Sequence, residues 1–127
     1  MINYLIENGY NWDGSTEGNK VAKSLASTIE WSHTPTEGSV GLDPEYNNLS
    51  GFSGLPAGYI RHTVINEIYH SYTHSSRNMF GSWWANTGTS IGRATFFQLG
   101  GILPRLSTGF SDNNDLVSIR LVRDLEQ

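Results

Sequence analysis

The chain has 127 residues, a formal net charge of −4 and an acidic pI of about 5.4. Only 16% of the residues are charged, without a cluster of lysine and arginine, and this excludes the basic patch typical of nucleic-acid-binding proteins. The absence of cysteine excludes disulfides, thiolate zinc sites and cysteine nucleophiles. The length is that of one domain, and we take residues 1–127 as a single unit.

No apolar run reaches the ~20 residues that a membrane-spanning helix needs, so no membrane span is expected. The N-terminus lacks the basic and apolar regions of a signal peptide. If the protein is exported, its targeting segment therefore lies outside this chain. A weakly charged, polar surface with scattered aromatic residues is typical of outward-facing recognition domains. The composition does not indicate an oligomeric state.

Two helices are predicted near the N-terminus. Residues Ile2 to Asn8 are amphipathic, and the pair Asn8-Gly9 is a favoured helix end. The second helix is predicted from Asn19 to Ile29, with Asn19 as its N-cap and apolar residues along one face. Residues Ser32 to Asn48 contain proline and glycine without periodicity, and they are predicted to form a long loop.

The segment Ser50–Arg61 interleaves Phe52, Leu55 and Tyr59 with glycines and a proline. Glycine and proline disfavour a helix here. The pattern instead predicts a short buried strand between tight turns, with glycine where two backbones approach closely.

Extended structure is predicted for most of the remaining chain. Residues 62–74 are rich in β-branched and aromatic residues, and Ser75–Asn78 has the composition of a turn. Trp83 and Trp84 are expected on opposite faces of their strand, one of them in the core. Residues 107–115 are predicted to be an exposed turn. The predicted strands of this region are Phe80–Thr87, Ile91–Leu99, Leu103–Leu106 as an edge strand, and Leu116–Asp124, which alternates with period two.

Three segments resemble a bacterial domain family, the Fibrobacter succinogenes major paralogous domain (FISUMP). They read SGFSGLPAGY (50–59), GSWWANT (81–87) and VSIRLVRD (117–124), and segments 4–14 and 18–27 also fit, in the same order. The resemblance implies a C-type-lectin-like α+β fold related to formylglycine-generating enzymes, with one or two short helices, a twisted and mostly antiparallel sheet and long loops. It also implies an exported or surface protein, often a lipoprotein. The family's N-terminal part is missing here, so we expect Leu116–Arg123 to lose a strand partner.

A catalytic site is not expected. The sulfatase-activating relatives use cysteine chemistry, which a chain without cysteine cannot perform. Ser53, His62 and Asp124 offer the residue types of a hydrolytic triad, but nothing in the sequence fixes their geometry. Many chains of this size contain such a set by chance. We therefore expect a protein that is not an enzyme.

A metal site and a cofactor are not expected either. His70 and His74 would share one face of a helix, yet in the predicted strand they lie about 13 Å apart at ~3.3 Å per residue. This is too far for one ion. The segment Asp112–Asp115 supplies oxygen atoms of the kind that calcium binds, but it is better explained as an ordinary Asx turn.

The resemblance implies that a ligand would bind on the C-terminal strands and loops. Aromatic and arginine side chains supply contact energy in such surfaces, and asparagine supplies adaptable hydrogen bonds. The leading hypothesis is non-catalytic recognition of a glycan or a protein at the cell surface or outside the cell. The alternative is a structural spacer module of a larger surface protein, without a ligand of its own. The candidate ligand-binding residues are Trp84, Asn86, Arg93, Phe97, Arg105, Phe110 and Asn113.

Overall fold

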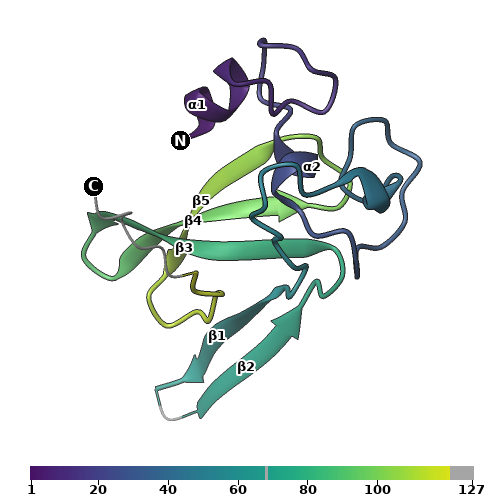
Figure 1. The fold of residues 1–127 in the computed structure, drawn as a ribbon. Helices are drawn as coiled ribbons and strands as arrows, with labels where there is room; N and C mark the ends of the chain where they lie inside the picture. The colour runs from purple at the N-terminus through teal and green to yellow at the C-terminus, as the bar shows by residue number, and fades with distance from the viewer. Residues whose placement is uncertain (68, 121–127) are drawn as a thin grey trace.

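Over the residues that the structure describes, five antiparallel strands and two short α-helices make up the fold, which confirms the predicted α+β class (Figure 1). The computed structural model describes residues 1–67 and 69–120. Within them, no helix is long and apolar enough to cross a membrane. In chain order the elements are α1 (Ile2–Glu7), α2 (Ala22–Leu25), the 3₁₀ turn η1 (Pro44–Tyr46), β1 (Tyr59–Asn66), β2 (Tyr69–Ser75), β3 (Phe80–Ser90), β4 (Arg93–Gly100) and β5 (Leu106–Asp112).

Helix α1 ends where the sequence predicts. The backbone N–H of Asn8 donates to the carbonyl of Tyr4 at 3.1 Å, and Gly9 follows with a φ of +78°. A left-handed conformation is the one that glycine adopts without steric cost, so the chain turns there.

The second predicted helix, Asn19–Ile29, is wrong in length, because only α2 forms. Asn19 does not cap this helix. Its side chain instead accepts the N–H of Leu106 at 3.1 Å and donates to the carbonyl of the same residue at 2.9 Å. Ala26 is extended, with a ψ of 151°, and forms a parallel bridge with Gly54. These tertiary backbone contacts replace the continuation of the helix.

The strands form two sheets that are joined by a short segment. One sheet is the hairpin β1–β2, and the other has the order β3-β4-β5. Leu116 exchanges two backbone hydrogen bonds with Ile60 of β1, at 2.8 and 2.9 Å. Ser118 accepts the N–H of Trp84 of β3 at 3.1 Å. The first residues of the predicted strand Leu116–Asp124 therefore have partners on both sides, and residues 121–124 lie outside the described residues.

The prediction for residues 103–115 is wrong in its boundaries. Leu103–Leu106 is not a strand, and Pro104 instead accepts the N–H of Ala22 through its carbonyl at 3.0 Å. The edge strand that pairs with β4 on the side away from β3 is β5, which covers most of the predicted turn. Serine, threonine and glycine dominate β5, and its side chains alternate between half-buried and exposed. A polar edge strand of this kind has no hydrophobic pattern from which it could be recognised.

The glycine-rich segment at the centre of the sequence packs against β3 without forming a buried strand. Residues 51–57 are irregular, and the side chain of Leu55 is 45% exposed, so the predicted strand is wrong. The predicted role of glycine is confirmed. A Cβ added at Gly54 would lie 2.8 Å from the ring of Trp83, and one added at Gly81 would lie 2.4 Å from the same ring. Only glycine allows this tryptophan to sit between the two backbones.

The hydrophobic core lies between the helices and one face of the β3–β5 sheet. Trp83 is opposite Phe97 in the register, and Leu99 is opposite Leu106, so all four share this face. One tryptophan of the pair was predicted in the core, and the structure identifies it as Trp83, whereas Trp84 is half-buried. The buried hydrophobic residues are Leu5, Val21, Ala22, Leu25, Ala26, Trp31, Val40, Trp83, Leu99 and Leu106.

Candidate functional site

An open groove lies between the β1–β2 hairpin and the β3–β5 sheet. It consists of two adjoining depressions of about 230 and 210 Å³, which share Arg61, Phe110 and Ser111. We call it the Arg61 groove. The first depression is also lined by Tyr59, Ser82, Phe96 and Gln98, and the second by His62, Arg93, Asp112 and Asp115.

Strand alternation brings the side chains of the first depression together. Tyr59 and Arg61 are two residues apart on β1 and therefore share a face, and the Arg61 guanidinium carbon lies 5.7 Å from the centre of the Tyr59 ring. Gln98 on β4 pairs with Ser82 on β3, and its amide nitrogen donates to the serine hydroxyl at 3.0 Å. Phe96 lies two residues before Gln98, on the same face of β4. Strands β1 and β4 thus supply aromatic, cationic and amide groups to one surface, and β3 adds the hydroxyl of Ser82.

Asp115 joins the groove's two sides. Its carboxylate is buried, with 8% of the residue exposed. One oxygen accepts the backbone N–H of His62 at 2.9 Å, and the other accepts the hydroxyl of Ser111. Both oxygens are therefore occupied within the protein, and the role of this carboxylate is to hold the chain after β5 against β1.

The segment Asp112–Asp115 forms a turn, as predicted, in which the N–H of Asp115 donates to the carbonyl of Asp112 at 3.0 Å. The Asp112 carboxylate lies 3.9 Å from Nε of Arg93, a long contact between two exposed side chains. Over residues 1–67 and 69–120, no three histidine, aspartate or glutamate residues cluster closely enough to hold one metal ion together.

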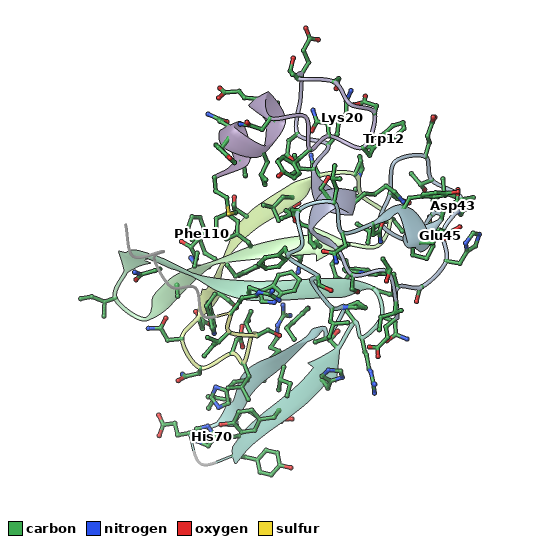
Figure 2. All side chains as sticks on the ribbon, in the orientation of Figure 1. Trp12, Lys20, Asp43, Glu45, His70 and Phe110 are labelled. Carbon is green, nitrogen blue, oxygen red and sulfur yellow. The ribbon has the colours of Figure 1, made fainter. Side chains whose placement is uncertain are left out.

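The predicted ligand-binding residues do not form one surface. Arg93 and Phe110 border the groove, but Phe110 alternates with Ser111 along β5, and Ser111 is the one that faces Asp115. In Figure 2 Phe110 lies on the other side of the sheet from His70 of the hairpin. The groove is therefore bordered by the backbone of Phe110, whose side chain points away.

The other predicted residues lie elsewhere. Trp84 and Phe97 line a separate apolar pocket of about 120 Å³ beside the core. Asn113 borders a third depression, next to the histidines of the hairpin. Asn86 and Arg105 are exposed and border none of these described hollows. The structure thus separates the predicted set, and the sequence prediction missed Tyr59, Arg61, Phe96 and Gln98.

The missed residues carry a partial signal in the sequence. Tyr59 and Arg61 stand at alternate positions where the β-rich segment begins, and Phe96 and Gln98 stand at alternate positions within the predicted strand Ile91–Leu99. What the sequence lacks is the information that these two faces meet. Their segments are more than thirty residues apart, and only the fold brings them together.

The two clearly shifted ionisable groups lie outside the groove. Burial lowers the pKa of Lys23, whose ammonium donates to the carbonyls of Ser39, Leu42 and Asp43 and so anchors the long loop. A hydrogen bond from Lys20 holds the pKa of the Asp13 carboxyl well below its usual range. Figure 2 shows Lys20 and Asp43 far from His70 of the hairpin. Both pKa shifts therefore belong to side chains that hold loops in place, and neither belongs to a group that lines the groove.

Comparison of the chain with models of known protein families, with curated proteins and with solved structures found no match. A functional proposal therefore rests on the residues of the groove and on their geometry.

Proposed function

We propose that this chain is a non-catalytic recognition domain that binds a glycan or a protein ligand in the Arg61 groove. The observation that carries the proposal is the meeting of Arg61, Phe96 and Gln98 on one open surface. Aromatic rings and guanidinium groups provide most of the contact energy in protein recognition. Amides and hydroxyls orient the ligand by hydrogen bonding.

The size and openness of the groove favour a segment of a large ligand. Depressions of about 230 and 210 Å³ are each smaller than the roughly 300–1,000 Å³ of enclosed small-molecule sites. An open groove of this size suits one or two sugar units of a glycan, or a few side chains of a protein. The hydrogen bonds of Asp115 to His62 and Ser111 hold the lining of the second depression in place.

The C-type-lectin-like identity and the resemblance to FISUMP belong to the same proposal. They are supported by the order of the matching segments, by the antiparallel sheet with its long loops, and by the position of residues 116–118 between β3 and β1. On this proposal the protein acts at the cell surface or outside the cell.

The test is a glycan array, with and without calcium, followed by titration of each hit against variants. We expect Arg61→Ala to weaken binding by about tenfold or more, because truncating a hot-spot side chain costs roughly 2 kcal/mol or more and tenfold corresponds to about 1.4 kcal/mol. Arg61→Lys keeps the charge but loses the planar fork, so it should restore only part of the affinity. Arg77→Ala is the matched control, since Arg77 is exposed in the turn before β3 and borders none of the hollows described above.

Two outcomes would contradict the proposal. A hit that survives Arg61→Ala but is lost in Trp84→Ala would place the site at the apolar pocket beside the core. A blank array, together with a blank screen of surface-protein ligands, would favour the spacer module without a ligand.

A further inference from the structure

A pair of histidines lies on the face of the hairpin opposite to Tyr59 and Arg61. The register of β1 and β2 pairs His62 with Tyr72 and Val64 with His70, so the two histidines are diagonal neighbours on one face. Nε2 of His62 and Nδ1 of His70 are 2.8 Å apart. This is an imidazole–imidazole hydrogen bond, in which one ring donates a proton to the lone pair of the other.

The two rings meet edge to edge. Their planes differ by 16° and their centres are 5.0 Å apart, a separation that places the bonded nitrogens on the line between the rings. The ring of Tyr72 packs 4.9 Å from that of His62. The backbone of His62 is held by the buried Asp115, which accepts its N–H. The His62 ring is thus half-buried on an anchored backbone and packs against Tyr72, whereas His70 is exposed.

We propose that His62 and His70 form a binding site for a divalent transition-metal ion of the kind that imidazole prefers: Zn²⁺, Ni²⁺ or Cu²⁺. Two nitrogens that each lie about 2.0–2.1 Å from one ion, at angles between square-planar and tetrahedral, are about 2.9–3.4 Å apart. The observed 2.8 Å is within a few tenths of an ångström of this range. A tilt of the His70 ring converts the hydrogen bond into a two-nitrogen chelate. The metal takes the place of the shared proton, and the ring that donated this proton regains one on its other nitrogen by exchange with water, so both imidazoles stay neutral.

The surroundings leave room for the remaining ligands. The two histidines open onto a hollow of about 510 Å³ that is bordered by Asn113 and Asn114 of the turn after β5. Water molecules or amide oxygens from this turn can complete the coordination. Asp115 is excluded as a ligand, since both of its oxygens are already bonded to His62 and Ser111. The two imidazoles lie on the face of the hairpin opposite to the Arg61 side chain, although His62 also borders the second depression of the Arg61 groove, so the two sites adjoin.

The test is calorimetric titration of the whole chain with zinc chloride and, separately, with nickel chloride. We expect one ion per chain. His62→Ala and His70→Ala should each weaken binding by about tenfold or more, as loss of a ligand costs at least as much as loss of a supporting group. His74→Ala is the matched control. His74 lies on β2 and on the same face as His70, but its ring bonds to the carbonyl of Ala57 and not to another histidine. Binding that is absent at millimolar metal, or that follows His74 or His33, would overturn the proposal.

A second measurement works on the unmodified protein and does not depend on the folding of a variant. Zinc added to the labelled chain should shift the imidazole resonances of His62 and His70 together, at one equivalent, before those of His33 and His74. Shifts that begin at His33 or His74 would contradict the site.

Discussion

Asn47 and Asn48 are adjacent but use opposite ends of their amides. Asn47 is buried, and its nitrogen donates to the carbonyls of Ser27 at 2.9 Å and of Val40 at 3.1 Å. Asn48 accepts the backbone N–H of Ser53 through its side-chain oxygen, at 2.7 Å. The first amide ties the long loop to the core, whereas the second closes a local turn.

This difference gives a matched pair of variants. Asn47→Asp places a buried carboxylate against two carbonyl oxygens and should lower the free energy of unfolding by about 3 kcal/mol or more. Asn48→Asp keeps the accepting oxygen, so its effect should stay within about 0.5 kcal/mol. Urea unfolding at pH 7 measures both. Equal losses in the two variants would show that the donor role of Asn47 is not what matters.

Asp13 makes part of the stability depend on pH. The Lys20 ammonium, and then the hydroxyl and N–H of Ser15, donate to its carboxylate and hold the pKa of this carboxyl well below its ordinary value. A carboxyl whose pKa is lowered by folding stabilises the folded state above its unfolded pKa of about 3.9, and this contribution disappears as the pH falls toward the folded pKa.

We therefore expect Asp13→Asn to be less stable than the natural chain at pH 7, with a difference in Tm that narrows below about pH 4. Thermal unfolding between pH 7 and pH 2 at low salt measures this difference. Because the pair lies near the surface, added salt should reduce it. A Tm difference that stays constant over this pH range would contradict the assignment.

At the scale of the elements, glycine sets how closely the chain that enters β1 approaches the end of β2. Gly58 precedes β1 with a φ of +71°, and a Cβ there would lie 2.2 Å from the carbonyl oxygen of Ser75. Gly14 has nearly the same φ, +70°, but nothing lies within 4 Å of a Cβ added to it. A side chain at either position would suffer the same backbone strain, because the φ angles are nearly equal. The two positions differ in whether a Cβ would collide with neighbouring atoms.

Substitution by alanine should separate the cost of the backbone strain from the cost of the steric clash. Gly14→Ala should cost about 1–2 kcal/mol, the strain of a left-handed residue with a side chain. Gly58→Ala should cost about 1–3 kcal/mol more, because the backbone of β2 must also move. Chemical denaturation of both variants provides the comparison, and equal costs would indicate that the contact with Ser75 relaxes freely.

At the scale of the whole molecule, the hairpin and the larger sheet differ in burial. Figure 1 shows β1 and β2 extending away from the sheet, and the side chains of Val64, Ile65 and Tyr72 are 53%, 57% and 61% exposed. Leu99 in β4 is fully buried. Few buried apolar contacts predict a low free energy of local opening.

Hydrogen exchange should therefore divide the chain into two regions. We expect the amides of β2 to exchange at least about tenfold faster than those in the centre of β4, after correction for intrinsic rates. Exchange measured by mass spectrometry on peptides from both strands gives this ratio. Similar protection in the two strands would mean that the hairpin and the sheet open as one cooperative unit.

The sequence by itself determined the features that depend on neighbouring residues. The α+β class, the end of α1 at Asn8-Gly9, the extended conformation of residues 62–66 and 69–74 and the strand from Phe80 follow from alternation and from turn residues close together in the chain. The sequence did not predict the break between β1 and β2 after Asn66. Each of these signals lies within a few neighbouring residues, so it can be recognised from the sequence without the tertiary structure.

Tertiary structure alone decided the length of α2, the existence of β5 and the composition of the candidate sites. Asn19 was predicted to cap a helix, but its side chain instead bonds to the backbone of Leu106. No local sequence pattern predicts a partner so far along the chain. The meeting of Arg61 with Phe96, and of His62 with His70, depends on how strands pair and how the two sheets face each other. Local propensity carries no information on register between distant segments, because that register is set by the packing of the whole chain.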